Sequence, residues 1–253
     1  MKKKLMRVAA VLPLLYFGWW AASSRGVAPP ASPLALEETL RAHGGREAID
    51  AIAAFRAQAV RLTSTQPPAF FERGMTLDVA GAKFRRQIEA PLGQRPQVEW
   101  FDGQRGFQLN SLDRAEKQPS VLAMNERRLQ AVKSNVALFG LLPILQRCAE
   151  LGVGTIAQDG GSERFSKFRV KTSAGEWTIY TDRSHLIRQV EIGPWLLQFA
   201  DYRSVGDLRL PFVQRLSSGQ RLVYELVFSA IELNPAFPAG YFTAETPARE
   251  VVH

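Results

Sequence analysis

The sequence has few of the residues from which catalytic and metal sites are built. Of its 253 residues, one is cysteine and three are histidine. Cys148 has no second cysteine to pair with, which excludes an intramolecular disulfide and a cysteine-based metal cluster. His43, His185 and His253 are far apart in the chain, and no spacing of acidic residues completes a zinc site around any of them. We therefore expect neither a metal nor a cofactor.

Sequence motifs of the common enzyme classes are also missing. The chain has no G-x-S-x-G nucleophile turn, no H-E-x-x-H pair and no phosphate-binding loop ending in Gly-Lys-Ser/Thr. Asp201, Tyr202 and Arg203 form a polar trio, which we interpret as strand-end hydrogen bonds or a surface ion pair. We predict that the protein is not an enzyme. In an enzyme built on this sequence, Arg61, Arg73 and Tyr202 would be the first residues to inspect.

A strong basic character is absent from the greater part of the chain. The formal net charge is +8. Lys2, Lys3, Lys4 and Arg7 lie in an N-terminal segment without acids, and without them 28 basic residues face 24 acidic ones. A nucleic-acid binder usually shows a clustered basic footprint. No such cluster is present, so we expect no nucleic-acid partner.

The N-terminus lacks an apolar run long enough to span a membrane with ease. The run from Val8 to Trp20 has 13 residues and is followed by Ala21–Ser24. A basic start, a short apolar core and small residues are typical of a signal peptide. We assign residues 1–24 to a signal peptide or N-terminal anchor and residues 25–31 to a linker. Export to the periplasm follows, with anchoring in the inner membrane if the segment is not cleaved.

What the chain does contain is a long succession of strand patterns between Trp177 and Phe242. Apolar and polar residues alternate there, as in a sheet with one buried face. Turn residues interrupt the pattern at 182–184, 193–194, 206–207 and 219, which indicates short connections between antiparallel strands.

The rest of the chain adds strands and a few helices. Short amphipathic helices are predicted between Ser32 and Ala54, with a stop at Gly44–Gly45, and five strands follow from Phe55 onward. We expect helices over Val121–Lys133 and Val136–Leu151, with Pro143 kinking or restarting the second helix and Cys148 buried in it. The predicted fold class is mainly β (α+β): a single strongly curved antiparallel sheet, a half-barrel of about eleven strands, which wraps these helices.

Three short motifs and one strand hairpin carry a resemblance to a known family. One is a helix–Gly-Gly–helix passage into the first strand, carried by Gly44, Gly45, Ile49, Ile52 and Phe55. Another is a Tyr–x–x–x–Gly–x–x–x–Pro passage, carried by Tyr202, Gly206, Leu210 and Pro211, and the last is a closing segment with Asn234 and Phe242. Together with the WTIYTD–LIRQVEI hairpin, they resemble the LolA/LolB-like half-barrels of outer-membrane lipoprotein sorting. The resemblance covers Leu34 to Pro247, so we place the domain at 32–247 and a tail at 248–253.

The resemblance implies a carrier or binding module that holds an acyl chain, a lipid or a lipidated protein in the concave face of the sheet. The residues expected to line this hydrophobic concavity are Phe71, Met75, Leu77, Trp100, Phe107, Trp177, Ile179, Trp195, Leu197 and Phe199. Leu138, Phe139 and Leu142 would belong to a helix that acts as a lid or plug. The same side chains also suit an ordinary core. The alternative is therefore an envelope interaction or sensor domain with a self-filled core and a protein partner.

Two further predictions concern contacts of the chain. Arg127 and Arg128 offer a surface for peripheral attachment to anionic lipid headgroups, although a solvated helix face has the same pattern. No feature of the sequence calls for a second copy, so we expect a monomer.

Overall fold

The computed structural model describes residues 33–65, 69–90, 95–109, 121–137, 140–150, 156–158, 166–172 and 175–243. The helices in this part of the chain are α1 (Pro33–Ala42), α2 (Arg46–Asp50), α3 (Glu126–Ala137) and α4 (Leu142–Glu150). The strands of the first half are β1 (Ala54–Thr65), β2 (Ala69–Ala80), β3 (Lys83–Ile88), β4 (Gln97–Phe101), β5 (Gly106–Leu109) and β6 (Val121–Ala123). Those of the second half are β7 (Ile156–Gln158), β8 (Ser166–Thr172), β9 (Gly175–Thr181), β10 (Ile187–Ile192), β11 (Trp195–Val205), β12 (Leu208–Ser218) and β13 (Arg221–Leu233).

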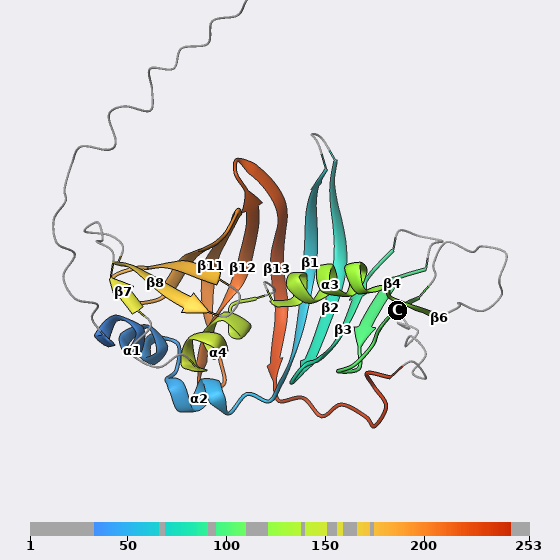
Figure 1. Ribbon diagram of the computed structural model, residues 1–253, viewed down its shortest axis with the longest axis horizontal. Coiled ribbons are helices and arrows are strands. Elements are labelled where there is room, and N and C mark those ends of the chain that lie inside the picture. Colours follow the sequence, from blue (N-terminus) through green and yellow to red (C-terminus); the bar gives the residue numbers. More distant parts are fainter. Residues whose placement is uncertain are drawn as a thin grey trace, which may run out of the picture.

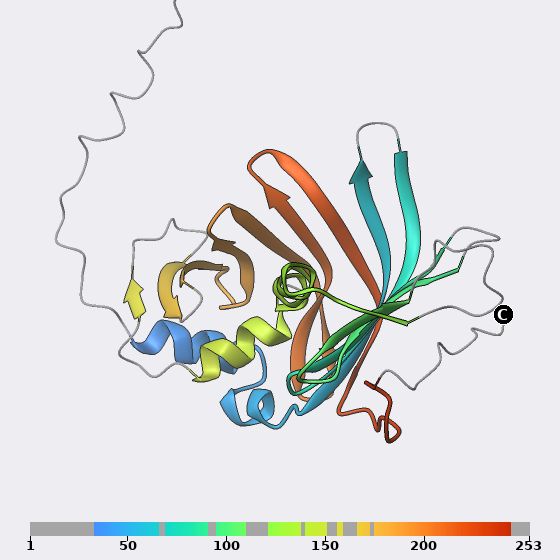
Figure 2. The ribbon, with the colours of Figure 1, turned by 45° about the vertical axis from the view of Figure 1, so that its right-hand side comes forward.

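These strands form one antiparallel sheet that curves around the helices. Among the described residues it has thirteen strands in the order β6-β5-β4-β3-β2-β1-β13-β12-β11-β10-β9-β8-β7 (Figure 1). Each half of the chain is a meander, and the two meanders join where β1 pairs with β13. Figure 2 shows the sheet bending around α3 and α4, which lie on its concave side. The predicted mainly β half-barrel is confirmed, with two more strands than the expected eleven.

The concave face of the sheet carries the core. Phe55, Ala57 and Ala59 of β1 alternate with more exposed residues, as period-two burial requires. Their partners on β2 include Leu77 and Met75, which are buried in the same cluster. Because neighbouring strands place directly paired residues on the same face, the register fixes which side chains meet the helices.

The helical segment between the two meanders differs from its prediction. Val121–Ala123 was expected to be helical, but it pairs with β5 as strand β6. Helix α3 begins after Asn125, whose side-chain Oδ1 accepts a bond of 2.9 Å from the backbone N–H of Arg128 and so caps the helix. Val136 belongs to α3, and α4 begins at Leu142, so the predicted restart of the helix at Pro143 is confirmed while its predicted start at Val136 is wrong. Pro143 lies in its first turn, where a missing N–H costs no helical hydrogen bond.

The stop at Gly44–Gly45 is confirmed and explained by close packing. Gly44 has a φ of +118°, and a Cβ atom on it would lie 2.4 Å from the carbonyl oxygen of Asp207. The end of α1 therefore packs directly on the turn between β11 and β12. This is the turn that the sequence predicted at 206–207. Only glycine permits this approach.

His43 fastens the same end of α1 to three strands. Its Nε2 accepts a bond of 3.2 Å from the backbone N–H of Ile187, so its Nδ1 carries the proton and donates to the carbonyl of Arg209 at 2.9 Å. The ring lies 5.5 Å from that of Tyr202, whose hydroxyl donates to the carbonyl of Ile187. Burial lowers the pKa of His43 to about 4, which keeps the ring neutral. The histidine thus has a structural role.

Asn234 joins the end of β13 to the start of β1. It adopts a positive φ of 50°. Its Oδ1 accepts bonds from the backbone N–H groups of Ala53 and Ala54 at 2.8 and 3.2 Å, and its Nδ2 donates to the carbonyl of Ala51 at 3.1 Å. The asparagine therefore fixes the register at the centre of the sheet.

Replacing Asn234 by alanine is expected to lower the free energy of unfolding by about 2 kcal/mol. About half of this loss comes from the side-chain hydrogen bonds and about half from alanine at a positive φ. Asn234→Gly is the matched control, since it loses the bonds but tolerates the backbone conformation. Urea unfolding of the two variants checks the difference; equal stabilities would show that backbone conformation contributes nothing.

Candidate functional site

Most of the predicted lining residues that can be placed lie on the concave face. Met75, Leu77, Trp177, Ile179, Leu197 and Phe199 are buried in one hydrophobic cluster, and Trp195 packs against its edge. Cross-strand pairing connects Ile179 to Leu197 through Val190, which pairs with both. The side chain of Phe71 lies outside the described part of the chain, as do Leu138 and Phe139.

Trp100 and Phe107 lie on the opposite face of the sheet. Trp100 pairs with Arg85 and with Phe107, whereas its neighbour Phe101 pairs with Phe84 and joins the core cluster. The aromatic residues Trp100 and Phe101 are adjacent in the sequence, so their side chains point to opposite faces of the sheet. An error of one residue in the assumed register therefore exchanges the residue that faces the helices for the one that faces away. The two residues therefore do not line the concavity.

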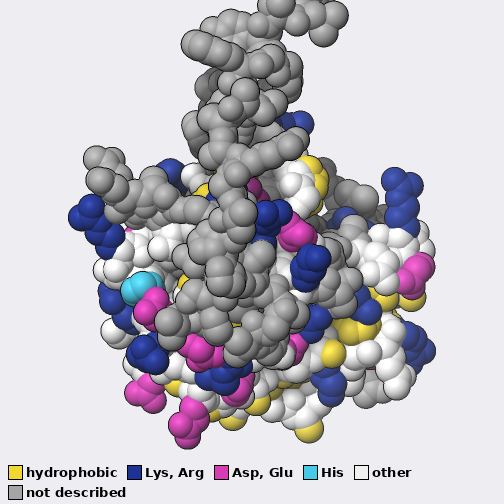
Figure 3. All heavy atoms as spheres, turned by 60° about the vertical axis from the view of Figure 1, so that its left-hand side comes forward, with side chains coloured by type: hydrophobic (Ala, Val, Ile, Leu, Met, Phe, Trp, Pro, Cys, Tyr) yellow, Lys and Arg dark blue, Asp and Glu magenta, His cyan; other side chains and the backbone are white. Residues whose placement is uncertain are grey.

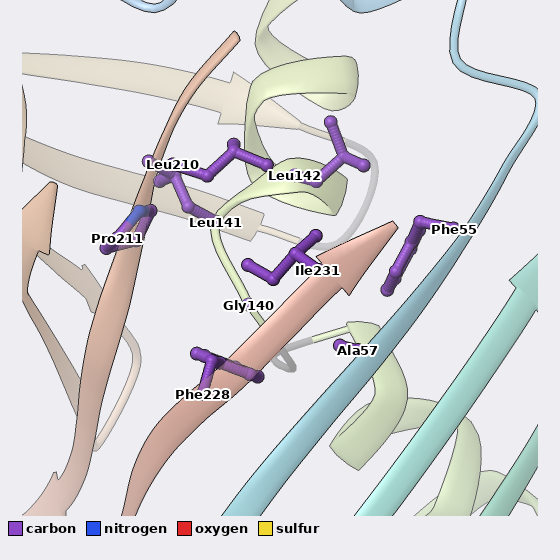
Figure 4. Close-up of a pocket in the computed structure, with 9 residues that line it drawn as sticks. All are labelled: Phe55, Ala57, Gly140, Leu141, Leu142, Leu210, Pro211, Phe228 and Ile231. Atoms are coloured by element: carbon purple, nitrogen blue, oxygen red, sulfur yellow. The ribbon is translucent and has the colours of Figure 1, made fainter. Parts of the chain in front are cut away.

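An entirely apolar pocket lies on the concave face beneath the start of α4. Its walls come from β1, β12 and β13, and its cover is the segment 140–142 (Figure 4). The lining residues are Phe55, Ala57, Gly140, Leu141, Leu142, Leu210, Pro211, Phe228 and Ile231. Its free volume is about 20 Å³, which is room for about one water-sized sphere. Leu141 and Leu142 thus occupy most of the space between α4 and the sheet.

Three polar contacts hold α4 in this position. The backbone N–H of Gly140 donates to Oε1 of Gln214 at 2.6 Å, and the Gln214 amide donates to the hydroxyl of Tyr224 at 3.1 Å. Gln146 donates to the carbonyl of Ile52 at 2.8 Å. At the other end of the helix, Arg46 of α2 donates to the carbonyl of Ala149. The cover of the pocket is therefore attached by hydrogen bonds that a rearrangement of the segment can break.

Helix α3 is attached through a buried carboxylate. Glu99 of β4 is 1% exposed. Its carboxylate forms ion pairs with Arg86 of β3 and Arg128 of α3 and accepts a hydrogen bond of 3.1 Å from the side chain of Gln97. Burial alone would raise the pKa of the Glu99 carboxyl, but the charges and hydrogen bonds of the two arginines outweigh it and lower the pKa. Glu99 is therefore charged and joins α3 to the concave face.

The contacts of α3 change the predicted lipid-facing surface. Arg128 is directed to Glu99, and Nζ of Lys133 lies 4.0 Å from the centre of the Phe101 ring. Of the two arginines proposed for headgroup contact, Arg127 remains exposed and without a role in the core. On the face seen in Figure 3, acidic and basic side chains are interspersed.

The other polar residues singled out from the sequence have structural roles. Asp201 and Arg203 form an exposed ion pair of 2.6 Å, as the sequence suggested. Burial raises the pKa of Cys148 to about 12, which leaves a small apolar side chain in α4. Within the described residues, no group of three His, Cys, Asp or Glu side chains is placed to hold a metal ion. None of the helices in this part of the chain has the length and hydrophobicity needed to cross a membrane.

Gln214 and Glu99 are the site residues that the sequence interpretation missed. A signal for Gln214 was present, because it continues the buried alternation of Leu210, Phe212 and Leu216 in β12. A polar residue at an inward-facing strand position requires a partner. The partner of Gln214 is Gly140 in the segment before α4. The local sequence around either residue does not predict that the two come into contact.

The fold defined by this sheet and its enclosed helices is LolA-like. A crystal structure of a DUF1329 family protein from Desulfovibrio piger superposes with a TM-score of 0.56 at 9% identity, covering 85% of this chain and 98% of that one. A LolA superfamily protein from Nitrosomonas europaea superposes with a TM-score of 0.52 at 12% identity, covering 85% and 98%. No known family profile matches the chain, and no curated protein matches its sequence.

Proposed function

We propose that this protein is an exported, non-enzymatic carrier or binding module for an acyl chain, a lipid or a lipidated protein. The observation that supports this function most directly is the apolar pocket between α4 and strands β1, β12 and β13. The LolA-like fold and the signal-like segment at 1–24 agree with it. The proposed site of action is the periplasm, with anchoring in the inner membrane if the segment 1–24 is not cleaved.

The pocket in its present form requires the segment 140–142 to move before a ligand enters. Withdrawing two buried leucines costs about 3–6 kcal/mol, because each contributes roughly 1.5–3 kcal/mol by burial. An entering acyl chain gains about 0.8 kcal/mol for each buried methylene. About four to eight methylenes therefore offset the displacement of Leu141 and Leu142. A long-chain acyl group exceeds that number, whereas a short one does not.

The carrier proposal predicts that Gln214→Leu accelerates ligand uptake. Leucine keeps the approximate shape of the side chain but removes the acceptor for the Gly140 N–H, a bond worth about 1.4 kcal/mol. We expect the association rate of a fluorescent long-chain fatty acid to rise about tenfold in stopped-flow measurements.

Gln198→Leu is the matched control for this variant. Gln198 lies exposed on β11 between the buried Leu197 and Phe199, so its side chain points away from the concavity. Its replacement should leave the association rate unchanged. Equal rates for wild type and Gln214→Leu would contradict the role of this bond in closing the pocket.

The second proposed function is an envelope interaction or sensor domain whose concavity stays filled by its own side chains. The free volume of about 20 Å³ favours it. Native mass spectrometry of protein purified from membranes separates the two functions. A retained lipid supports the carrier; a lipid-free protein that takes up no fluorescent fatty acid, but cross-links to an envelope protein, supports the sensor.

A further inference from the structure

A second cavity lies on the outer face of the sheet, across β1–β3 from the core. It has a free volume of about 200 Å³, ten times that of the apolar pocket. Its lining is polar and comes from three adjacent strands and the C-terminal segment. The lining residues are Arg56, Gln58, Thr76, Asp78, Arg85, Gln87 and Tyr241. Nothing in the proposed carrier function uses this cavity.

The strand register arranges these side chains in two rows. Asp78 of β2 pairs with Arg56 on one side and with Arg85 on the other, which forms a charged row. One step along the strands, Thr76 pairs with Gln58 and with Gln87, which forms a row of amides around a hydroxyl. The segment after β13 runs past the ends of these strands (Figure 1) and contributes Tyr241.

The charged row is held rigidly. Nε of Arg56 donates to Oδ1 of Asp78 at 2.7 Å, and the hydroxyl of Tyr241 donates to Oδ2 of the same carboxylate. The guanidinium of Arg85 lies 5.2 Å from the centre of the Tyr241 ring and 5.8 Å from that of Trp100. Asp78 and Arg85 are 1% and 4% exposed. Buried polar groups with fixed geometry in a cavity are the usual components of a specific polar binding site.

The chemistry of the lining selects against ions of either sign. The charges around the cavity balance, because Arg56 and Arg85 are matched by Asp78 and, at the exposed edge, by Glu232, which lies 3.9 Å from Arg56. An ion of either sign therefore gains no net attraction and loses hydration on entry. The cavity offers hydrogen-bond donors from guanidinium and amide groups and acceptors from carboxylate and amide oxygens. A hydroxyl group both donates and accepts, so a neutral ligand with several hydroxyls satisfies both kinds. The Tyr241 ring supplies an apolar wall.

We propose that this outer cavity binds a neutral, hydroxyl-rich small molecule of the size of a single sugar ring. Trp100 and Phe107, which were expected in the concavity, acquire a role here. Trp100 pairs with Arg85 and so continues the charged row onto β4, with its ring 5.8 Å from the Arg85 guanidinium. The ring of Phe107 on β5 stacks on that of Trp100 at 5.7 Å. The proposal does not depend on the acyl-chain site, because the two cavities lie on opposite faces of the sheet.

Saturation-transfer NMR on the full chain tests this site with glucose, galactose and mannose, together with the charged analogues glucuronate and glucosamine. At least one neutral sugar is expected to bind with a Kd of about 1 mM, and more tightly than either charged analogue. Gln87→Leu and the shape-conserving Thr76→Val should each weaken binding about tenfold. Gln198→Leu, on the same face but outside the cavity, should bind as wild type does.

Several results would overturn the proposal. They are the absence of a signal from all three neutral sugars at about 10 mM, tighter binding of a charged analogue, or unchanged binding in both cavity variants. Because Thr76→Val conserves shape, loss of binding with an unchanged melting temperature identifies the contact itself. Fatty acid uptake should be the same in wild type and Thr76→Val, so failure at one site is distinguishable from failure at the other.

Discussion

Replacing Glu99 by leucine is expected to lower the free energy of unfolding by about 3–5 kcal/mol. The substitution leaves the guanidinium of Arg86, whose side chain is 11% exposed, without its carboxylate, and an uncompensated buried charge carries a penalty of that size. It also frees Arg128 and with it the attachment of α3 to β4. Chemical denaturation followed by circular dichroism measures the loss.

Two further variants separate the charge from the packing in this prediction. Arg128→Gln should cost about 1 kcal/mol or less, because the Arg128 side chain is 45% exposed and its ion pair is screened by solvent. The double variant Glu99→Leu with Arg86→Met removes both buried charges and should recover most of the stability. A double variant as unstable as Glu99→Leu alone would contradict the account and assign the loss to packing.

Acidification from pH 7 to pH 4 is expected to remove about 3 kcal/mol of stability through His43. The pKa of this residue is about 4 in the folded protein, against an ordinary value of 6.5, and each unit corresponds to about 1.4 kcal/mol. Between these values the unfolded chain binds a proton that the folded protein does not, so stability falls as the pH falls. The contribution is fully lost below the folded pKa. The physical reason is that burial removes the water that would stabilise the charged ring. In addition, a protonated Nε2 can no longer accept from the backbone N–H of Ile187.

His43→Gln provides the control for this pH dependence. The variant is less stable at pH 7 because its amide fits the two backbone groups less well, but position 43 no longer carries a titratable group. Carboxylates such as Glu99, whose pKa is lowered, lose their contribution at more acidic pH. Between pH 4.5 and 6.5 the wild-type stability curve should therefore be steeper than that of His43→Gln, and parallel curves would show that His43 is not the group responsible.

The sheet was predictable because its determinants are local. Alternation of buried and exposed residues and turn residues such as Gly206 and Gly219 specify strands and hairpins within a few positions. The structure explains two of the residues that carried the family resemblance. Gly44 allows the end of α1 to pack closely on a turn, and Asn234 joins β13 to β1. Each serves the fold, which is why the resemblance predicted architecture better than it predicted a site.

The site was only partly predictable because it depends on which face of the sheet each side chain occupies and on contacts between residues far apart in the sequence. Trp100 and Phe101 are adjacent, and only the pairing with β3 decides which of them faces the helices. Leu142 was expected in a lid or plug helix and lies in the segment that covers the pocket, whereas its neighbour Leu141 and the anchoring Gln214 were not named. The polar outer cavity is formed by three strands whose register no single segment specifies.

The central claim, that the concavity beneath α4 accepts an acyl chain, is tested most directly by NMR with ¹³C-labelled palmitate. The account predicts nuclear Overhauser contacts from the acyl methylenes to the methyl groups of Leu142, Leu210 and Ile231, which line the apolar pocket. It also predicts that Leu141 and Leu142 shift most strongly on binding, since they must move aside. Absence of these contacts at saturating palmitate, or contacts confined to the outer face, would contradict it.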